Sequence, residues 1–474
     1  MTAGSSIAGI LLSLVLLMWL AYRGISVLIL APLLALLAVL LSPDAPLLAS
    51  YTQVFMRALG GFVIAFFPLF LLGALFGKLM QASGAARVLA LAIVARLGER
   101  RAVSSVVLAC ALLTYGGVSL FVVAFAVYPI AVELFRAANL PKRLIPATIA
   151  LGAFTFTMTA LPGTPAIQNA IPMPYFGTTP FAAPGLGLLA GLLMLVLGLA
   201  WLSHRARHAA ARGETYGEDG PAQAAVGEAV ASSSASTDVP PLPVTLALAP
   251  IVTVVVLNYL MAEIVLPRVD AGYLAQALYG AVGMDAVRGV WSIIVALTAG
   301  VLLLIALAWR RLPALGDTLD AGATSAVAPI FNTASQVGYG AVIASLAGFT
   351  LIRDAVLGIA PGNPLVSLSI SVNVLAGITG SASGGMSIAL QTLGSTYLAL
   401  GQAAGIHPDL LHRVTAIATG GLDALPHNGA VITLLSICGL THRQSYLDIF
   451  VVAVAVPVLV LVVVVWLGSV YGSF

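Results

Sequence analysis

The chain has 474 residues, of which 60% are hydrophobic and only 8% are charged, and its mean hydropathy is +1.08. Soluble globular proteins carry about 25% charged residues, so this composition excludes a soluble domain and predicts an all-α polytopic membrane protein. The net charge of +3 is small and dispersed, which argues against a nucleic-acid partner. Cys110 and Cys438 lie in apolar runs. We expect both to be buried thiols, without a disulfide or a bound metal.

The first apolar run, Ile7 to Leu20, predicts a transmembrane helix. No positive charge precedes this run and no small-residue cleavage site follows it, so a cleavable signal is not expected. Further runs of about 17–25 apolar residues each predict a crossing. The ten predicted crossings are Ser5–Ala21, Ile25–Leu41, Gly61–Gln81, Leu144–Met173, Gly185–Leu202, Pro243–Leu266, Val290–Trp309, Ala323–Leu346, Leu411–Ser436 and Tyr446–Val470.

Two apolar stretches, 103–136 and 364–400, are too long for one plain span. Thr114–Ser119 lies in the middle of the first and Thr379–Gly385 in the middle of the second. Glycine and serine runs allow a tight turn, so each stretch is expected to form a re-entrant hairpin of two short helices. A kinked single span and two short full spans are the alternatives.

The distribution of positive charges tests this layout, because cytoplasmic loops are rich in lysine and arginine. With ten crossings and two hairpins, 15 of the 20 Lys and Arg residues fall on the side that holds Arg23. That side is therefore predicted to be cytoplasmic, with both termini outside. The residues assigned to the opposite side are Arg57, Arg268, Arg288, Arg353 and Arg413. Lys78 and Glu133 are expected near membrane edges.

The stretches Ala160–Ala166 and Ala424–Ala430 interrupt two predicted crossings with proline and glycine. Non-helical backbone at membrane depth persists only where it is buried in protein or lines a cavity, so broken helices of this kind indicate a transport site. A shift of 264 residues places Pro162 on Pro426 and the first hairpin tip on the second. Five crossings separate the two units, so the second repeat is expected to be inverted.

These repeats divide the chain into five predicted parts. The second repeat contains hairpin 364–400 and broken helix 411–436, and the first contains hairpin 103–136 and broken helix 144–173. The parts are N-terminal helices 1–60, first inverted repeat 61–203, disordered cytoplasmic linker 204–242, connecting scaffold helices 243–322 and second inverted repeat 323–474.

The substrate site is expected where the two hairpin tips and the two breaks meet. These four pieces contain no arginine or lysine, so an anion would depend mainly on helix N-termini, hydroxyls, amides and a protonated His427. The candidate substrate-binding residues are Tyr115, Gly116, Gly117, Ser119, Pro162, Gly163, Thr164, Gln168, Asn169, Thr379, Gly380, Ser381, Ser383, His427 and Asn428.

Asp423 and His427 are ionisable residues four apart at the second break, where the first repeat has neutral residues. Histidine titrates near physiological pH, so His427 is a candidate for the coupling proton and Asp423 for tuning it. Alternatively, Asp423 only caps the broken helix and His427 hydrogen-bonds a carbonyl. Gly187 and Gly191 form a G-x-x-x-G pattern, which indicates close helix packing within the chain or at a dimer face.

The stretch Leu72–Arg87 resembles the early signature of the gluconate permease family. The order of hairpin tip, polar turn with Leu140-Pro141 and broken helix also follows that family, which belongs to the ion transporter superfamily. Gly163-Thr164-Pro165 is similar to the broken helix of the superfamily's divalent anion/sodium symporters. The resemblance covers most of 5–202 and, more loosely, 323–470. It implies a homodimer with a mobile transport part moving as an elevator, and uptake of a small carboxylate with protons or with sodium.

Two departures from the gluconate permeases bear on the substrate. Their tip tyrosine is followed by an acidic residue, where this chain has Gly116, and their first break carries a histidine, which Leu161–Pro165 does not contain. The more apolar site suits a smaller or less hydroxylated acid, such as 3-hydroxybutyrate.

The sequence thus predicts a proton-coupled importer of small organic acid anions in a bacterial inner membrane, with no cofactor. A sodium-coupled carboxylate symporter and a channel are the alternatives. An intramembrane enzyme is disfavoured because neither H-E-x-x-H nor G-x-S-x-G is present.

Overall fold

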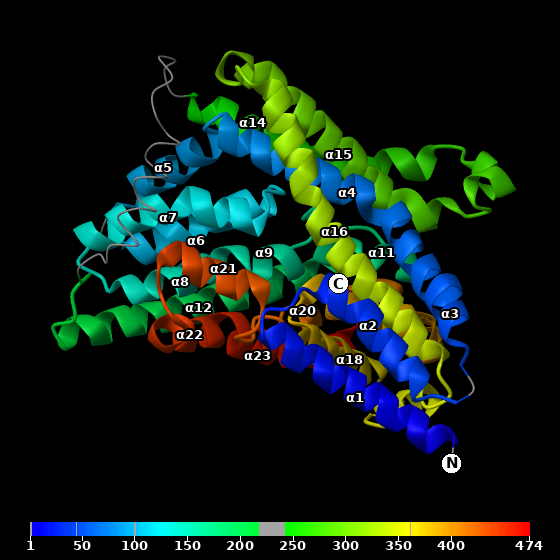
Figure 1. Cartoon of the computed structure of the whole chain (residues 1–474). Helices are drawn as coiled ribbons and strands as arrows, with labels where there is room; N and C mark the ends of the chain where they lie inside the picture. The colour runs from blue at the N-terminus through cyan, green and yellow to red at the C-terminus, as the bar shows by residue number, and fades with distance from the viewer. Residues whose placement is uncertain (1, 44, 99–100, 218–241, 361) are drawn as a thin grey trace.

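The computed structural model describes residues 2–43, 45–98, 101–217, 242–360 and 362–474 (Figure 1). Regular structure in these ranges is helical, with no β-strand. Seven helices of the described chain are long and apolar enough to cross a membrane, and a bent pair brings the number to as many as eight. Shorter apolar helices add to these. The prediction of an all-α polytopic membrane protein is confirmed.

The N-terminal helices are α1 (Thr2–Tyr22) and α2 (Val27–Leu40). A one-turn helix, α3 (Leu47–Ala49), and a π-helical segment (Ser50–Phe55) then lead into α4 (Met56–Ala82). Together they make one 36-residue helix, which begins well before the predicted crossing Gly61–Gln81. Side chains of α1 and α2 pack on α16 (Leu315–Ser345) in an apolar cluster of their own.

Both long apolar stretches fold as two helices joined by a short turn. The first pairs α6 (Ala102–Tyr115) with α7 (Leu120–Ala137), and the second pairs α18 (Pro364–Thr379) with α19 (Ala382–Ala403). Gly117 and Gly380 occupy the turns at φ +94° and +59°, a left-handed region that favours glycine. Serines at the ends of these turns, Ser119 and Ser381, cap α7 and α19.

Both predicted breaks are present. The first span consists of α8 (Ile145–Ala153), α9 (Phe156–Thr159), α10 (Ile167–Ala170) and α11 (Met173–Phe176), with irregular chain between α9 and α10. The second consists of α20 (Pro408–Thr419) and α21 (Gly429–Cys438), separated by residues 420–428. Each break leaves backbone carbonyls without helical hydrogen-bond partners. Side chains of other elements donate hydrogen bonds to several of them.

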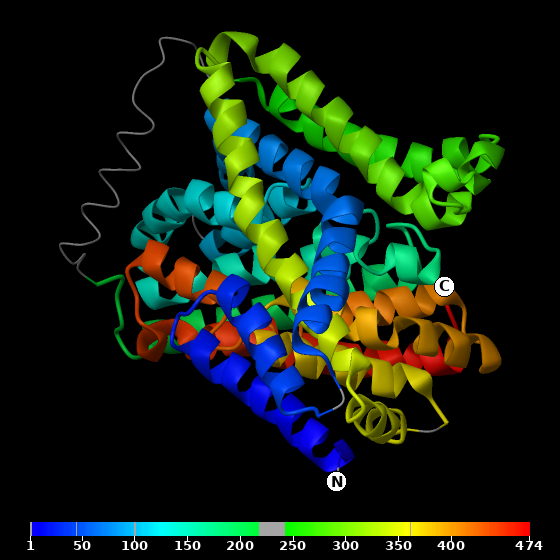
Figure 2. The ribbon, with the colours of Figure 1, turned by 45° about the vertical axis from the view of Figure 1, so that its right-hand side comes forward.

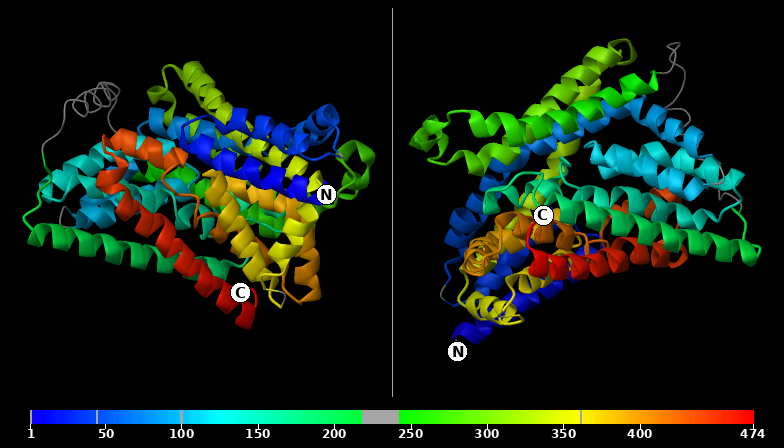
Figure 3. Two further views of the ribbon diagram at one scale, coloured as in Figure 1. Left: turned by 60° about the horizontal axis from the view of Figure 1, so that its bottom comes forward. Right: turned by 180° about the vertical axis from the view of Figure 1, so that it is seen from behind.

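The remaining long helices surround these parts. They are α5 (Ala85–Leu97), α12 (Pro184–Ala211), α14 (Val244–Tyr259), α15 (Met284–Ala308), α22 (His442–Phe450) and α23 (Val456–Tyr471). A pair formed by α14 and α15 projects from the main body alongside α4 (Figure 2). Seen from behind, α12 and α23 run along each other (Figure 3). After α16 the chain bends by 96° into α17 (Phe349–Leu357).

The prediction that residues 204–242 form a disordered linker is wrong for the first part of this segment. Helix α12 continues to Ala211, and Glu214 then pairs with Arg143, with Nε–Oε1 and Nη2–Oε2 distances of 2.6 and 2.9 Å. The Tyr216 ring lies under the Arg136 guanidinium. These contacts order the chain because a bidentate arginine–carboxylate pair fixes both partners. Residues 218–241 of the predicted linker lie outside the described residues.

Candidate functional site

Both hairpin tips and both breaks meet at one cavity of about 1080 Å³. It lies between elements far apart in the chain, from the α1–α2 connection to α21. Several candidate residues line it, as the sequence predicted for the meeting point of the four pieces. They are Gly117, Ser119, Gln168, Thr379, Gly380, Ser381, Ser383, Asp423, His427 and Asn428.

Several helices begin at this cavity, and three of them have side-chain caps that lie in the hairpin tips or the second break and line it. These caps are Ser119 on α7, Ser381 on α19 and Asn428 on α21. Each cap accepts a hydrogen bond from the first turn of its own helix, and the remaining first-turn N–H groups have no intrahelical acceptor. Helix N-termini carry partial positive charge, so the cavity is suited to an anion.

The other candidate residues turn away from the cavity and build the first break. Tyr115 donates from its hydroxyl to the carbonyl of Pro162 at 2.9 Å, and the carbonyl of Gly163 accepts from Asn258 of α14 at 3.0 Å. Asn169 donates to the carbonyls of Thr164 and Pro180 at 3.1 and 2.9 Å. Gly116 packs against Ile251. These residues shape the break from behind the cavity.

A buried arginine joins the two breaks, which the sequence did not predict. Arg413 on α20 is fully buried and donates to the carbonyls of Ala182, Thr159 and Pro180 over 2.8–3.3 Å. The sequence assigned Arg413 to the side opposite the cytoplasm and predicted no contact with the first repeat. The carbonyls that satisfy this charge lie at the end of α9 and in the connection between α11 and α12.

His412, next to Arg413, is also fully buried. Its Nε2 lies 3.2 Å from Asn169 Oδ1, which also accepts from Arg413, and its Nδ1 lies 2.6 Å from Thr178 Oγ1. Asn169 Oδ1 can only accept, so Nε2 carries the imidazole proton and Nδ1 accepts from Thr178. This pair braces the first break rather than facing the cavity.

The second break is held from α22. Tyr446 donates from its hydroxyl to the carbonyl of Ala424 at 3.0 Å, and His442 Nε2 lies 2.8 Å from the carbonyl of Pro426. Asn428 Nδ2 donates to the carbonyl of Gly380 at 2.9 Å, which ties the break to the second hairpin tip. The break and the tip therefore form one packed unit.

Glycines of α12 make room for the first break. A side chain at Gly187 would strike the carbonyl of Ala160, and one at Gly191 would strike Leu161. The G-x-x-x-G pattern therefore serves close packing within the chain, which was one of its two predicted uses.

Two further elements, α4 and α16, complete the cavity and were missed from the sequence. Lys78 and Gln81 of α4 line it together with Gly24 of the α1–α2 connection. Helix α16 contributes Ser325, Asn332, Thr333 and Gln336. The sequence signal was a polar patch inside the predicted crossing Ala323–Leu346, where a lipid-facing helix would be apolar.

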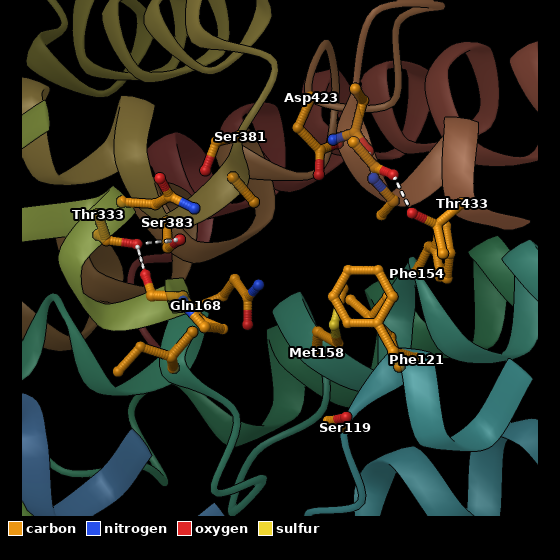
Figure 4. A pocket seen from close by; sticks show the side chains of 18 of the residues that line it. Ser119, Phe121, Phe154, Met158, Gln168, Thr333, Ser381, Ser383, Asp423 and Thr433 are labelled. Carbon is orange, nitrogen blue, oxygen red and sulfur yellow. Dashed lines mark hydrogen bonds between the residues drawn. The ribbon is translucent and has the colours of Figure 1, made fainter. Parts of the chain in front are cut away.

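The cavity has two chemically different walls (Figure 4). Gln168, Thr333, Ser381 and Ser383 gather on one side, and Thr333 and Ser383 lie 3.2 Å apart through their hydroxyl oxygens. The aromatic and thioether side chains on the other side are Phe121, Phe154 and Met158. Asp423 approaches from the second break. A ligand with a charged end, a polar group and a short carbon chain fits such a site.

No protein-family model matches the chain. It is 17% identical to the YdaH transporter of Alcanivorax borkumensis, whose crystal structure has an unusual topology, with a TM-score of 0.53 over 88% of this chain and 87% of that one. This likeness shows the fold alone. The uncharacterized transporter YxjC of Bacillus subtilis (strain 168) is 45% identical over 449 residues, which are 94% of each chain. The chain therefore belongs to the same membrane transporter family as YxjC.

Proposed function

We propose that this transporter takes up small organic acid anions together with protons, by alternating access of the elevator type. The observation that carries the proposal is the convergence of three helix N-termini and the ionisable pair Asp423 and His427 on one cavity. Helix N-termini attract a carboxylate, and a histidine and an aspartate at membrane depth can carry the proton. The resemblance to gluconate permeases supports the same substrate class.

The substrate is a gluconate-like acid or a short hydroxycarboxylate such as 3-hydroxybutyrate. Phe121, Phe154 and Met158 favour the shorter and less hydroxylated acid, because a polyhydroxylated chain would leave hydroxyls against an apolar wall. Residues at the cavity bind it directly. Tyr115, Gly116, Pro162, Gly163, Thr164 and Asn169 act by shaping the first break.

The moving part comprises both hairpins and both broken spans, which pack on one another and on α12, α22 and α23. The fixed scaffold comprises α4, α14, α15 and α16, which pack on one another, and the working unit is a homodimer. The inverted repeats are 61–203 and 323–474. Lys78 and Gly24 lie on the side predicted to be cytoplasmic, so this conformation opens inward.

Two alternatives use the same cavity. The hydroxyl and carbonyl oxygens of the hairpin tips suit a sodium ion, so a sodium-coupled symporter is the second candidate. A channel is the third, because broken helices also line pores. Both are separated from the proposal by transport assays.

The experiment is uptake by the purified protein in proteoliposomes, with labelled gluconate, 3-hydroxybutyrate, citrate and succinate offered separately. The proposal predicts saturable accumulation of one or more of these acids, and accelerated exchange when unlabelled acid is loaded inside. Flux that does not saturate and shows no exchange would indicate a channel. Absence of flux for every acid, with the protein correctly folded, would overturn the carboxylate assignment.

A further inference from the structure

Helices α4 and α16 begin the two predicted repeats, and a register three residues shorter than the one that superimposes the breaks aligns them. A shift of 261 residues places Gly322, Ala326, Pro329, Phe331 and Gly338 on Gly61, Ala65, Pro68, Phe70 and Gly77. In the same register, Asn332, Thr333 and Gln336 of α16 stand where α4 has Leu71, Leu72 and Leu75. Leu72 and Leu75 pack against the apolar core. The three leucines of α4 are not among the residues that line the cavity, whereas Asn332, Thr333 and Gln336 line it from α16.

The polar side chains of α16 meet the second hairpin tip. Thr333 Oγ1 lies 3.2 Å from Ser383 Oγ. Gln336 lies over Gly384, where a Cβ would collide with its Oε1. A glycine at the tip is thus required for Gln336 to reach this place. The amide is 2% exposed and lines the cavity.

Several oxygen atoms at this place lack a hydrogen-bond partner among the residues that the structure describes. They are Asn332 Oδ1, Gln336 Oε1 and Asp423 Oδ1, all on residues that line the cavity. Buried acceptors are costly when they stay unpaired, and native proteins leave few of them. A ligand that donates a hydrogen bond here would satisfy one of the two amide oxygens of α16. A carboxylate would not, because it has no proton to donate.

We propose that Asn332, Thr333 and Gln336 form a hydroxyl-recognising wall, and that the substrate is a short hydroxy acid rather than a plain carboxylic acid. This rests on the proposed uptake of organic acid anions. The carboxylate lies at the N-termini of α7, α19 and α21, and the hydroxyl donates its one proton to an amide oxygen of α16. The carbon chain lies against Phe121, Phe154 and Met158 (Figure 4).

A site built to bind a hydroxyl rejects the analogue that lacks it, because its buried polar groups then stay unpaired. Leucine is the informative replacement, because the first repeat carries it at the matching positions. Asn332→Leu and Gln336→Leu remove the acceptors and keep the side-chain bulk. Thr333→Val removes one hydroxyl without changing shape and serves if a leucine variant folds poorly. Thr318→Ala, at the far end of α16, is the matched control.

The test is inhibition of labelled 3-hydroxybutyrate uptake in proteoliposomes by unlabelled 3-hydroxybutyrate or butyrate. In the wild type, butyrate should inhibit at least about 100-fold more weakly. In Asn332→Leu and Gln336→Leu, KM for the hydroxy acid should rise about tenfold and the preference for it should largely disappear. Thr318→Ala should behave as the wild type.

The outcomes separate this inference from the proposed function. If the wild type takes up 3-hydroxybutyrate and butyrate inhibits as strongly as unlabelled 3-hydroxybutyrate, recognition of the hydroxyl is overturned. The proposed transport of carboxylates is then unaffected. Leucine variants that retain the full preference overturn the role of α16. A wild type that transports none of the four acids offered singly, nor butyrate, overturns both.

Discussion

Arg413 on the second broken span donates to the side-chain oxygen of Asn169 on the first, over 3.1 Å. The same guanidinium donates to the carbonyl of Thr159, at the end of α9, and to the carbonyls of Pro180 and Ala182, in the connection between α11 and α12. The two halves of the molecule are therefore joined beside the cavity. The geometry of the first break depends on a residue of the second repeat.

Arg413→Met should lower the free energy of unfolding by about 3–5 kcal/mol, because several buried carbonyls and Asn169 lose their donor. Denaturant or thermal unfolding in detergent measures the change. Arg353→Met is the control, since Arg353 is exposed and pairs with neighbouring Asp354, and it should cost about 0–1 kcal/mol. Equal losses of stability in the two variants would contradict a stabilising role for the hydrogen bonds of Arg413.

Gly187→Ala should destabilise the protein by about 1–3 kcal/mol, because the added methyl group would strike the carbonyl of Ala160 at the first break. Gly60→Ala is the matched control. It lies inside α4 with open space around its Cα, so alanine there should be neutral or stabilising by up to about 1 kcal/mol. Unfolding temperatures of the two variants should move in different directions. A Gly187→Ala protein as stable as the wild type would show that the break can shift.

Asn428 has two roles that substitutions can separate. Its Oδ1 accepts from the N–H groups of Ala430 and Val431, and its Nδ2 donates to the carbonyl of Gly380. Asn428→Ala should lose the cap, at about 0.5–2 kcal/mol. Asn428→Asp should keep the cap and lose the link to the hairpin tip. We therefore expect uptake to fall by about tenfold in both variants, and the unfolding temperature to fall further in the alanine variant, which loses both the cap and the link. Normal uptake by Asn428→Asp would contradict a role for the link.

Glu214 lies after α12, outside the membrane-spanning segments, and its hydrogen bond to Arg143 lowers the pKa of its carboxyl below the ordinary value of 4.5. A group with a lowered pKa adds stability above its unfolded pKa and loses it as pH falls through the folded pKa. Glu214→Gln should therefore destabilise the protein at pH 7, by about 0–1 kcal/mol since the pair is partly exposed.

The difference between Glu214→Gln and the wild type should shrink as the pH falls below about 4.5, where the wild-type carboxyl takes up its proton. Unfolding temperatures measured across this range check the sign. Asp320 is an exposed residue of α16, and Asp320→Asn controls for the loss of one negative charge. A difference that grows on acidification would contradict the pairing.

The helices, the hairpin turns and the breaks could be predicted from the sequence, because each of them has a local signal. Gly117 and Gly380 permit the left-handed turns, and proline and glycine interrupt the spans. The repeat also predicted which pieces meet. Ser119, Ser381 and Asn428 line the cavity as N-caps because glycine-rich turns bring each helix start inward.

The remaining features depend on packing between distant elements. Arg413 resembled a loop residue because nothing local indicates which carbonyls will surround it. Tyr115 and Asn169 were predicted to bind substrate, but the partners of each side chain at the first break turn it away from the cavity. The polar positions of α16 are visible in the sequence, yet their contact with the second hairpin tip appears only once the chain is folded.

The most direct test of proton-coupled uptake is the response of the purified protein in proteoliposomes to an inward proton gradient without sodium. The acid found to be transported is used as substrate, and His427→Ala is compared with the exposed control His208→Ala. We predict accumulation that a protonophore abolishes, and a loss of proton-driven uptake in His427→Ala that exceeds its loss of substrate binding. Uptake that appears only when sodium is added, and is unchanged in His427→Ala, would contradict proton coupling at the second break.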